Sequence, residues 1–341
     1  MVQTGGATSG KGHVSMRALI CRQWGGIEQL QIGEAPVPRP GTGEVLIRVK
    51  ATAVNYADAI MVAGRYQTKP ELPFSPGLET AGIIEACGPD VQSLKPGDRV
   101  MAILAYGGLA EYAVAPAAET YVIPPGMSFT EAGAFPIAYI SSHVAIRWQG
   151  RLEPGETMLV LGAAGGVGLT AVEIGKAMGA RVIAAASTAE KLAVATAHGA
   201  DATVNYTSEK LTERVMALTN DKGADVCFDP VGGPLFDAAL SSLGWGGRIL
   251  LVGFVGGVPQ IPANRLLVKH RAALGSSLRY FRWHAPDKLE RSVEELLRWY
   301  AEGKLKPCIS HRLPLERTVE AIRLLTDRQA HGKIVVELES A

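Results

Sequence analysis

The pattern of hydrophobic and polar positions along the chain changes near residue 140. Before this point, short apolar runs alternate with turns that contain Gly and Pro, such as PGTGE and KPGDR. Short runs separated by regular turns predict a compact β domain of the barrel or sandwich type. The expected strands lie in the runs MRALICRQW, EVLIRVKATAVN, TAGIIEACG, DRVMAIL and LAEYAVAP.

Beyond residue 140, apolar strands alternate with amphipathic stretches such as GLTAVEIGKAMGA and AEKLAVATAHGA. The apolar side chains of these stretches recur at helical spacing. Strands that are joined by helices form a parallel sheet covered on both faces. We therefore predict the α/β fold class, with a β domain and a doubly wound parallel sheet of six strands. These six strands are expected at 157–162, 181–186, 202–205, 225–229, 248–253 and 272–277.

The two ends of the chain have patterns of their own. After Tyr280 come a helical pattern, an extended piece, a second helical pattern and the strand KIVVEL, and we expect this part to return to the first domain. The first fifteen residues are small and polar and lack the apolar stretch of a secretory signal, so a disordered leader is expected. The expected units are a leader (1–15), the β domain (16–138), the parallel-sheet domain (139–278) and the C-terminal part of the β domain (279–341).

Composition and charge narrow the function classes. The chain has 34 basic and 33 acidic residues and a net charge of +1, which favours neither a nucleic-acid nor a membrane surface. No apolar run approaches the roughly 20 residues that a spanning helix needs. None of the four cysteines pairs with another at C-x-x-C spacing, so no metal or redox pair is expected. We predict a reduced, cytoplasmic protein.

A glycine turn lies between the first two strands of the expected parallel sheet, in LGAAGGVGLTAVEIGKAMGARVIAAAS. It has the form Ala163-x-Gly165-x-x-Gly168, with alanine at the position of the usual first glycine. Gly165 would let the backbone approach a pyrophosphate, and Gly168 would let the helix pack against the strand. A strand before the turn and a helix after it predict a dinucleotide site with its phosphates at the helix N-terminus.

The second strand of this unit is followed by Ser187, at the position where many NAD-binding units carry an acid. An acid there would repel a 2′-phosphate, whereas Ser187, Lys191 and Tyr206 can all donate hydrogen bonds to one. Another interpretation is that Ser187 and Glu190 form a capping box of the S-x-x-E type. The two roles are compatible, and we predict NADPH as the cofactor.

Segments along most of the chain resemble the zinc-independent quinone oxidoreductases of the medium-chain dehydrogenase/reductase superfamily. The matching segments are GEVLIRVKATAVNYAD, PFSPGLETAGIIEACG, LKPGDRVMA, PGETMLVLGAAGGVGLTAVEIGKAMGARVIA, ADVCFDPVGG and HGKIVVEL. The resemblance implies a GroES-like catalytic domain, a Rossmann cofactor domain and an active site in the cleft between them. It also implies a homodimer that pairs through the Rossmann sheet.

The zinc-dependent branch of this superfamily differs at the metal site. Its metal is held by a cysteine where this chain has Asn55, and by the histidine of a Gly-His-Glu triplet that here is Gly77-Leu78-Glu79. Leucine cannot bind zinc, and the cysteine-rich structural lobe is missing. The resemblance therefore implies no metal and a direct hydride transfer to an acceptor that is already electrophilic.

The resemblance also implies roles for single residues. Asn55, beside the nicotinamide, and Tyr66, at the mouth of the substrate cleft, are the expected catalytic residues. The expected cofactor contacts are Asn55, Ser141, Ala163, Gly165, Gly166, Val167, Gly168, Ser187, Lys191, Tyr206 and Phe254. Other interpretations stay open: Asn55 and Ser141 could be helix caps, and Tyr66 could be ordinary packing. Asp58 and Glu79 are expected to make structural hydrogen bonds.

The expected function is that of an NADPH:quinone reductase. A quinone needs little acid catalysis because the hydroquinone anion is stable, whereas an enone or 2-enoyl-thioester reductase needs a proton donor. That alternative uses the same scaffold, with Tyr66 as the donor. A third alternative is a cofactor-binding protein without turnover, as among relatives of zeta-crystallin. The near-neutral charge speaks against an RNA-binding form of it.

Overall fold

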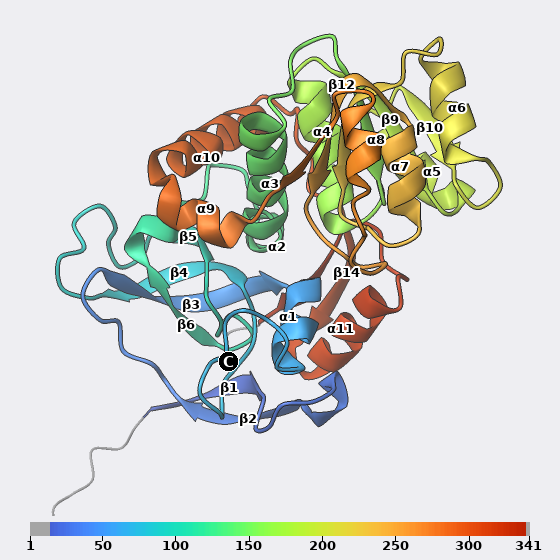
Figure 1. The fold of residues 1–341 in the computed structure, drawn as a ribbon. Helices are drawn as coiled ribbons and strands as arrows, with labels where there is room; N and C mark the ends of the chain where they lie inside the picture. The colour runs from blue at the N-terminus through green and yellow to red at the C-terminus, as the bar shows by residue number, and fades with distance from the viewer. Residues whose placement is uncertain (1–13, 339–341) are drawn as a thin grey trace, which may run out of the picture.

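The computed structural model describes residues 14–338 and contains two large β-sheets and one two-stranded sheet (Figure 1). The two-stranded sheet pairs β1 (Ser15–Ile20) with β2 (Gln31–Pro36) in antiparallel fashion. Most of the predicted leader, residues 1–13, lies outside the described residues. The predicted boundary at residue 15 is slightly late, because Ser15 already pairs with Pro36.

A seven-stranded sheet takes its strands from both ends of the chain. Its order is β14-β15-β3-β4-β5-β7, and β6 pairs with β3. The strands are β3 (Glu44–Ala53), β4 (Glu79–Cys87), β5 (Arg99–Ile103), β6 (Tyr112–Pro116), β7 (Thr120–Val122), β14 (Ile309–Pro314) and β15 (Lys333–Glu337). Because β15 pairs with β3, the last strand lies beside the segment that leads to Asn55.

The second large sheet has six parallel strands in the order β10-β9-β8-β11-β12-β13, and this confirms the predicted α/β fold class. The strands are β8 (Thr157–Leu161), β9 (Arg181–Ala186), β10 (Ala202–Asn205), β11 (Ala224–Asp229), β12 (Leu243–Leu251) and β13 (Ala272–Gly275). Along β8, Met158 and Val160 pack into one hydrophobic cluster, and Leu159 and Leu161 pack into another. Both faces of the sheet are therefore buried, as is typical of parallel sheets.

Helices cover both faces of the parallel sheet (Figure 1). The clusters on the two faces include residues of α3, α4 and α10 on one side and of α6 and α7 on the other. The helices of this part are α3 (Pro136–His143), α4 (Gly166–Ala177), α5 (Ala189–Ala197), α6 (Leu211–Leu218), α7 (Leu235–Ser241), α8 (Ala263–Leu267), α9 (Leu278–His284) and α10 (Pro286–Ala301). Among residues 14–338, no helix combines the length and the apolar character that a bilayer span requires.

The remaining helices lie near the seven-stranded sheet. They are α1 (Tyr56–Val62), α2 (Phe129–Gly133) and α11 (Thr318–Thr326), together with short turns at Ile27–Gln29, Ala117–Glu119 and Leu315–Arg317. A π-helical turn at Val144–Gln149 instead continues α3 and packs against α4 and β12 of the parallel-sheet part. The two large sheets meet where the start of α4 faces the start of β15. There, Gly165 and Gly332 form an isolated β-bridge, and the Gly332 N–H donates to the carbonyl of Ala164 at 2.8 Å.

Candidate functional site

The glycine turn joins β8 to α4 at the point where the strand order of the parallel sheet reverses, between β8 and β11. A Cβ on Gly168 would lie 2.1 Å from the carbonyl oxygen of Gly162, so only glycine lets α4 pack this close to the strand. On Gly165 a Cβ would have one neighbour within 4 Å, the Gly162 carbonyl oxygen at 3.3 Å, so this residue is far less crowded than Gly168. The first turn of α4 contains no acid, and its free N–H groups favour an anion.

Other predicted cofactor residues surround this turn. Ala163 is buried, and its N–H donates to the carbonyl of Ala185 at 3.1 Å, which ties the turn to β9. The Val167 carbonyl accepts the hydroxyl of Ser142 at 2.9 Å. Ser141 lies inside α3, whose N-cap is Phe135, so the interpretation of Ser141 as a helix cap is wrong. Within residues 14–338, the Ser141 hydroxyl has no hydrogen-bond partner.

The end of β9 differs from the predicted capping box. The N-cap of α5 is Thr188, whose hydroxyl oxygen accepts the N–H of Lys191 at 3.2 Å. Ser187 is one residue too early to cap, because β9 ends at Ala186 and α5 begins at Ala189. The capping-box interpretation of Ser187 and Glu190 is therefore wrong, and the Ser187 hydroxyl is available to another partner.

Several hydrogen-bond donors gather beside Ser187. Tyr206 follows β10, and its N–H donates to the carbonyl of Ala186 at 3.2 Å, so Tyr206 lies next to the end of β9. The Lys191 ammonium donates to the carbonyl of Arg328 at 3.2 Å and pairs with no carboxylate in the described part of the chain. Arg328 was missed in the sequence; it has a left-handed backbone conformation with φ of 60°. The end of β9 therefore has several hydrogen-bond donors, and a serine stands where many NAD-binding units have an acid.

A buried polar atom without a partner lies close to these donors. His331 Nε2 is buried and makes no hydrogen bond, and a carboxylate oxygen of Glu190 lies 3.9 Å from it. Buried polar atoms are almost always hydrogen-bonded, so an unpaired one indicates a missing partner. His331 precedes Gly332, which bonds the glycine turn through Ala164. The open turn, the donors and this unpaired nitrogen fit a dinucleotide with a 2′-phosphate.

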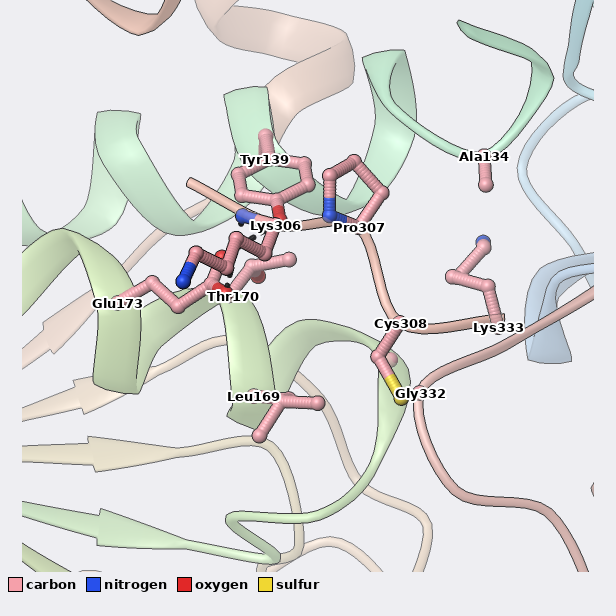
Figure 2. Close-up of a pocket in the computed structure, with 11 residues that line it drawn as sticks. Ala134, Tyr139, Leu169, Thr170, Glu173, Lys306, Pro307, Cys308, Gly332 and Lys333 are labelled. Carbon is pink, nitrogen blue, oxygen red and sulfur yellow. Dashed lines mark hydrogen bonds between the residues drawn. The ribbon is translucent and has the colours of Figure 1, made fainter. Parts of the chain in front are cut away.

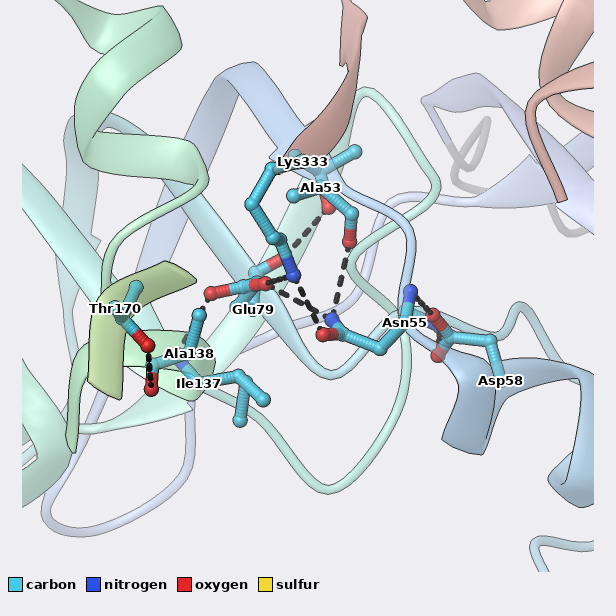
Figure 3. A network of polar contacts seen from close by, with 10 residues as sticks. Ala53, Asn55, Asp58, Glu79, Ile137, Ala138, Thr170 and Lys333 are labelled. Atoms are coloured by element: carbon cyan, nitrogen blue, oxygen red, sulfur yellow. Dashed lines mark hydrogen bonds and ion pairs between the residues drawn. The ribbon is translucent and has the colours of Figure 1, made fainter. Parts of the chain in front are cut away.

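A buried polar network surrounds Asn55 (Figure 3). Asn55 Nδ2 donates to Glu79 Oε1 at 2.9 Å, and Asn55 Oδ1 accepts from the Lys333 ammonium at 2.6 Å. The same ammonium lies 2.9 Å from Glu79 Oε1, while Glu79 Oε2 accepts the N–H of Ile137 at 2.8 Å. Glu79 and Asp58 are fully buried, and Asn55 and Lys333 are nearly so. The network joins the seven-stranded sheet to the start of α3.

Asn55 is also a helix cap, which was the other interpretation of this residue from the sequence. It is the N-cap residue of α1, and its backbone N–H donates to Asp58 Oδ2 at 2.7 Å. Asp58 Oδ1 accepts the N–H of Gly77 at 3.2 Å. Burial raises the pKa of the Asp58 carboxyl to about 7, against the lowering effect of these bonds. Asp58 and Glu79 thus make the hydrogen bonds of a structural role.

Lys333 is the functional candidate that sequence reasoning missed. It follows Gly332, which has φ of 61° and no room for a Cβ beside the Cys308 carbonyl. A positive-φ glycine before the final strand marks a close contact of this segment with another part of the chain. The sequence signal was the triplet His331-Gly332-Lys333 directly before KIVVEL.

Tyr66 and Phe254 take no part in the hydrogen bonds of the network, although the charge of Asp58 acts on the Tyr66 hydroxyl. Tyr66 is half-buried in the loop after α1; burial raises the pKa of its hydroxyl, and Arg279 of α9 opposes this rise. Arg279 donates to the hydroxyl of Thr68 at 2.7 Å, so α9 reaches the loop that carries Tyr66. Phe254 follows β12 and is 46% exposed. Within residues 14–338, the hydrogen bonds of Asn55 involve Ala53, Asp58, Glu79 and Lys333 but neither Tyr66 nor Phe254.

A small cavity lies between α4 and the segment that leads into β14 (Figure 2). Tyr139, Thr170, Glu173, Cys308 and Lys333 are among its lining residues. The Tyr139 hydroxyl donates to Glu173 at 2.6 Å across it. Its volume of about 10 Å³ holds one water molecule at most, so it is a packing junction between the two sheets and no substrate site.

Comparisons with known proteins agree with this architecture. Residues 41–125 match the alcohol dehydrogenase GroES-like domain, and residues 166–300 match the zinc-binding dehydrogenase family. A quinone oxidoreductase-like protein 2 homolog from Nematostella vectensis is 39% identical over 330 residues, which cover 95% of this chain and 90% of that protein. The chain belongs to the quinone oxidoreductase branch of the medium-chain dehydrogenase/reductase superfamily.

Solved structures from the same branch superpose over nearly the full chain. Quinone oxidoreductase from Escherichia coli, complexed with NADPH, is 28% identical with a TM-score of 0.88, over 95% of this chain and 100% of that one. Quinone oxidoreductase from Pseudomonas syringae pv. tomato is 30% identical with a TM-score of 0.89, over 94% and 99% of the two chains. The GroES-like and Rossmann parts of this chain are therefore assigned to the seven-stranded and six-stranded sheets.

One family description contains zinc, but the residues of this chain do not suit a metal. Leu78 is buried in the core between Gly77 and Glu79 and offers no ligand atom. The cation beside Asn55 and Glu79 is the ammonium of Lys333. Residues 14–338 contain no group of three or more His, Cys, Asp or Glu side chains placed to hold a metal ion.

Proposed function

We propose that this protein is an NADPH-dependent oxidoreductase that reduces quinones without a metal. The observation that carries the proposal is the set of donors at the end of β9, where Ser187, Lys191 and Tyr206 stand at the position of the usual acid. NADPH in complex with the Escherichia coli relative supports the same cofactor. When bound, NADPH supplies the hydride that the acceptor receives.

Different residues of the chain would bind different parts of NADPH. The amides of Gly165, Gly166 and Val167 at the start of α4 would hold the pyrophosphate. The donors at the end of β9, with Arg328 beside them, would hold the 2′-phosphate. Ser141 and Asn55 would flank the nicotinamide, and the backbone at Phe254 would pass its ribose.

The hydrogen bonds of the network favour a quinone as acceptor. Both N–H bonds of the Asn55 amide have partners in the protein, at Glu79 and at the carbonyl of Ala53. The carboxylates of Glu79 and Asp58 are buried and already accept hydrogen bonds. The pKa of Asp58 is raised to about 7, but both of its carboxyl oxygens, like those of Glu79, already have partners within the protein. None of these groups is therefore placed to give a proton to a substrate, and a quinone does not need one.

A comparison of two acceptors tests the function. We expect NADPH to be oxidised with 1,4-benzoquinone at a kcat/KM far above that with a crotonyl thioester. A preference for the thioester would instead establish the enone-reductase alternative. NADPH binding without turnover on either acceptor would establish the binding-protein alternative.

Removal of metal is expected to leave the activity unchanged. The reason is that Leu78 cannot bind zinc and that the Lys333 ammonium already lies between Asn55 and Glu79. Elemental analysis of the purified protein should find no stoichiometric zinc, and NADPH oxidation should persist in excess chelator. One zinc per chain, lost together with activity, would contradict this expectation.

We also propose that the protein is a homodimer paired through its Rossmann sheet. β13 is an edge strand of this sheet, and an unpaired edge readily pairs with a second copy. Large apolar side chains are exposed in the neighbouring segments, including Trp245 at 76%, Leu267 at 78% and Val268 at 76%. Sedimentation at micromolar concentration should show a dimer, and a clean monomer would refute the proposal.

A further inference from the structure

We infer that Lys333 is a positioning residue that holds the Asn55 amide at a fixed place relative to the glycine turn. Its ammonium bonds Asn55 and Glu79, while its aliphatic stem lies against Gly166. The inference rests on the proposed function, since it concerns the geometry in which NADPH meets its acceptor. It adds a residue that belongs to neither the turn nor the predicted site.

The charges around Asn55 leave its amide only one orientation. The Asn55 oxygen faces the Lys333 ammonium, which can only donate, and the Asn55 nitrogen faces the Glu79 carboxylate, which can only accept. Rotation of the amide by half a turn would place two donors together and two acceptors together. Lys333 fixes the oxygen side of the Asn55 amide, while Glu79 and the carbonyl of Ala53 fix its nitrogen side. Without the ammonium, the amide oxygen has no partner to hold it in place.

The other end of Lys333 contacts the cofactor turn. A Cβ on Gly166 would lie 3.0 Å from Lys333 Cδ, so the stem of the lysine packs directly on the start of α4. The preceding residue, Gly332, bonds Ala164 through its backbone N–H at 2.8 Å. One side chain therefore spans from the turn that would hold the pyrophosphate to the amide that would lie beside the nicotinamide.

The Lys333→Met variant tests this role together with Glu79→Gln and the double variant. Methionine keeps an unbranched stem against Gly166 but removes the ammonium. Lys333→Met alone leaves the buried Glu79 carboxylate without its cation, so we expect a lower melting temperature. The double variant has no unpaired charge and should melt near the wild-type temperature. Lys176→Met is the matched control. It also replaces a lysine by methionine, but the ammonium of Lys176 bonds Asp201 at 2.8 Å and takes no part in the network around Asn55.

The readout that separates positioning from charge balance is kcat in the double variant. We expect kcat for NADPH oxidation with 1,4-benzoquinone in the double variant to remain on the order of 100-fold below that of the wild type. Small displacements of reacting groups can slow a reaction by this factor. The dissociation constant of NADPH should stay within about threefold of the wild-type value. The binding free energy then changes by much less than about 1.4 kcal/mol, which is the value of a tenfold effect. The control Lys176→Met should keep the wild-type kcat.

Wild-type kcat in the double variant would overturn the inference, since Lys333 would then only balance Glu79. The fluorescence of bound NADPH provides a second test that needs no turnover. Its emission should differ between the wild type and the double variant at equal occupancy, because the surroundings of the nicotinamide change. Identical emission would also overturn the inference. Failure of the proposed function is recognised separately, by a wild-type protein that binds NADPH but reduces no quinone.

Discussion

Replacement of Gly168 by alanine is expected to destabilise the fold, whereas replacement of Gly165 is expected to weaken NADPH binding alone. The Cβ of Gly168→Ala would lie 2.1 Å from the carbonyl oxygen of Gly162, and this backbone cannot move without separating α4 from β8. Overpacking of a core costs typically 1–3 kcal/mol and at times more, so we expect a loss of about 3 kcal/mol. Denaturant unfolding measures it.

The Gly165→Ala variant is the matched partner. Its Cβ would meet only the Gly162 carbonyl oxygen, at 3.3 Å instead of the 2.1 Å at Gly168, and its φ of −79° suits any residue. The unfolding free energy should therefore change much less than in Gly168→Ala. The added methyl group would stand where the pyrophosphate approaches the backbone. We expect the dissociation constant of NADPH to rise by at least about tenfold, or about 1.4 kcal/mol, in a fluorescence titration. Unchanged NADPH binding in Gly165→Ala would show that the phosphates lie elsewhere.

The Ser187→Asp and Lys191→Ala substitutions together are expected to reverse the cofactor preference from NADPH to NADH. A hydroxyl and an ammonium make charge-assisted bonds to a phosphate of about 1.5–3 kcal/mol each when shielded from water. Both residues are partly exposed, so the expected total is roughly 2–3 kcal/mol, or a preference of about 30- to 150-fold. The new carboxylate would accept the ribose hydroxyls and repel a 2′-phosphate. Added salt should reduce the wild-type preference, because exposed charge contacts are screened.

Two neighbouring variants serve as controls for this reversal. Thr188→Ala removes the observed N-cap of α5 and should cost about 1 kcal/mol of stability without changing the cofactor preference. Ser187→Ala should have the opposite profile, with a weaker preference and unchanged stability. A loss of stability in Ser187→Ala would instead indicate that Ser187 caps α5, a role that the structure gives to Thr188.

The fold was predictable where periodicity is strong and local. Every predicted strand of the Rossmann sheet overlaps an observed one, because parallel strands buried on both faces are continuous apolar runs. β12 begins at Leu243, five residues before the predicted start, since LGWGG interrupts its apolar pattern. β2 and β7 were not predicted; QIGEAP is mostly polar or small, and TYV is too short to show a period.

The site was predictable only in part, because some of its residues meet through long-range contacts. The glycine turn and Ser187 lie within a single strand–helix–strand unit, whose pattern is legible along the chain. Lys333 meets Asn55 from 278 positions away, through the pairing of β15 with β3, and no local pattern contains this contact. The cap at Thr188 was missed for a smaller reason: the true start of α5 is one residue later than Ser187 and Glu190 suggested.

The central claim is that this chain holds the 2′-phosphate of NADPH at the end of β9. The most direct test is the ratio of kcat/KM for NADPH to that for NADH, measured with the same quinone on the wild type and on Lys191→Ala. We predict a wild-type preference for NADPH of about 30- to 150-fold and a clear fall in Lys191→Ala. Equal kcat/KM for the two nucleotides in the wild type would contradict the account.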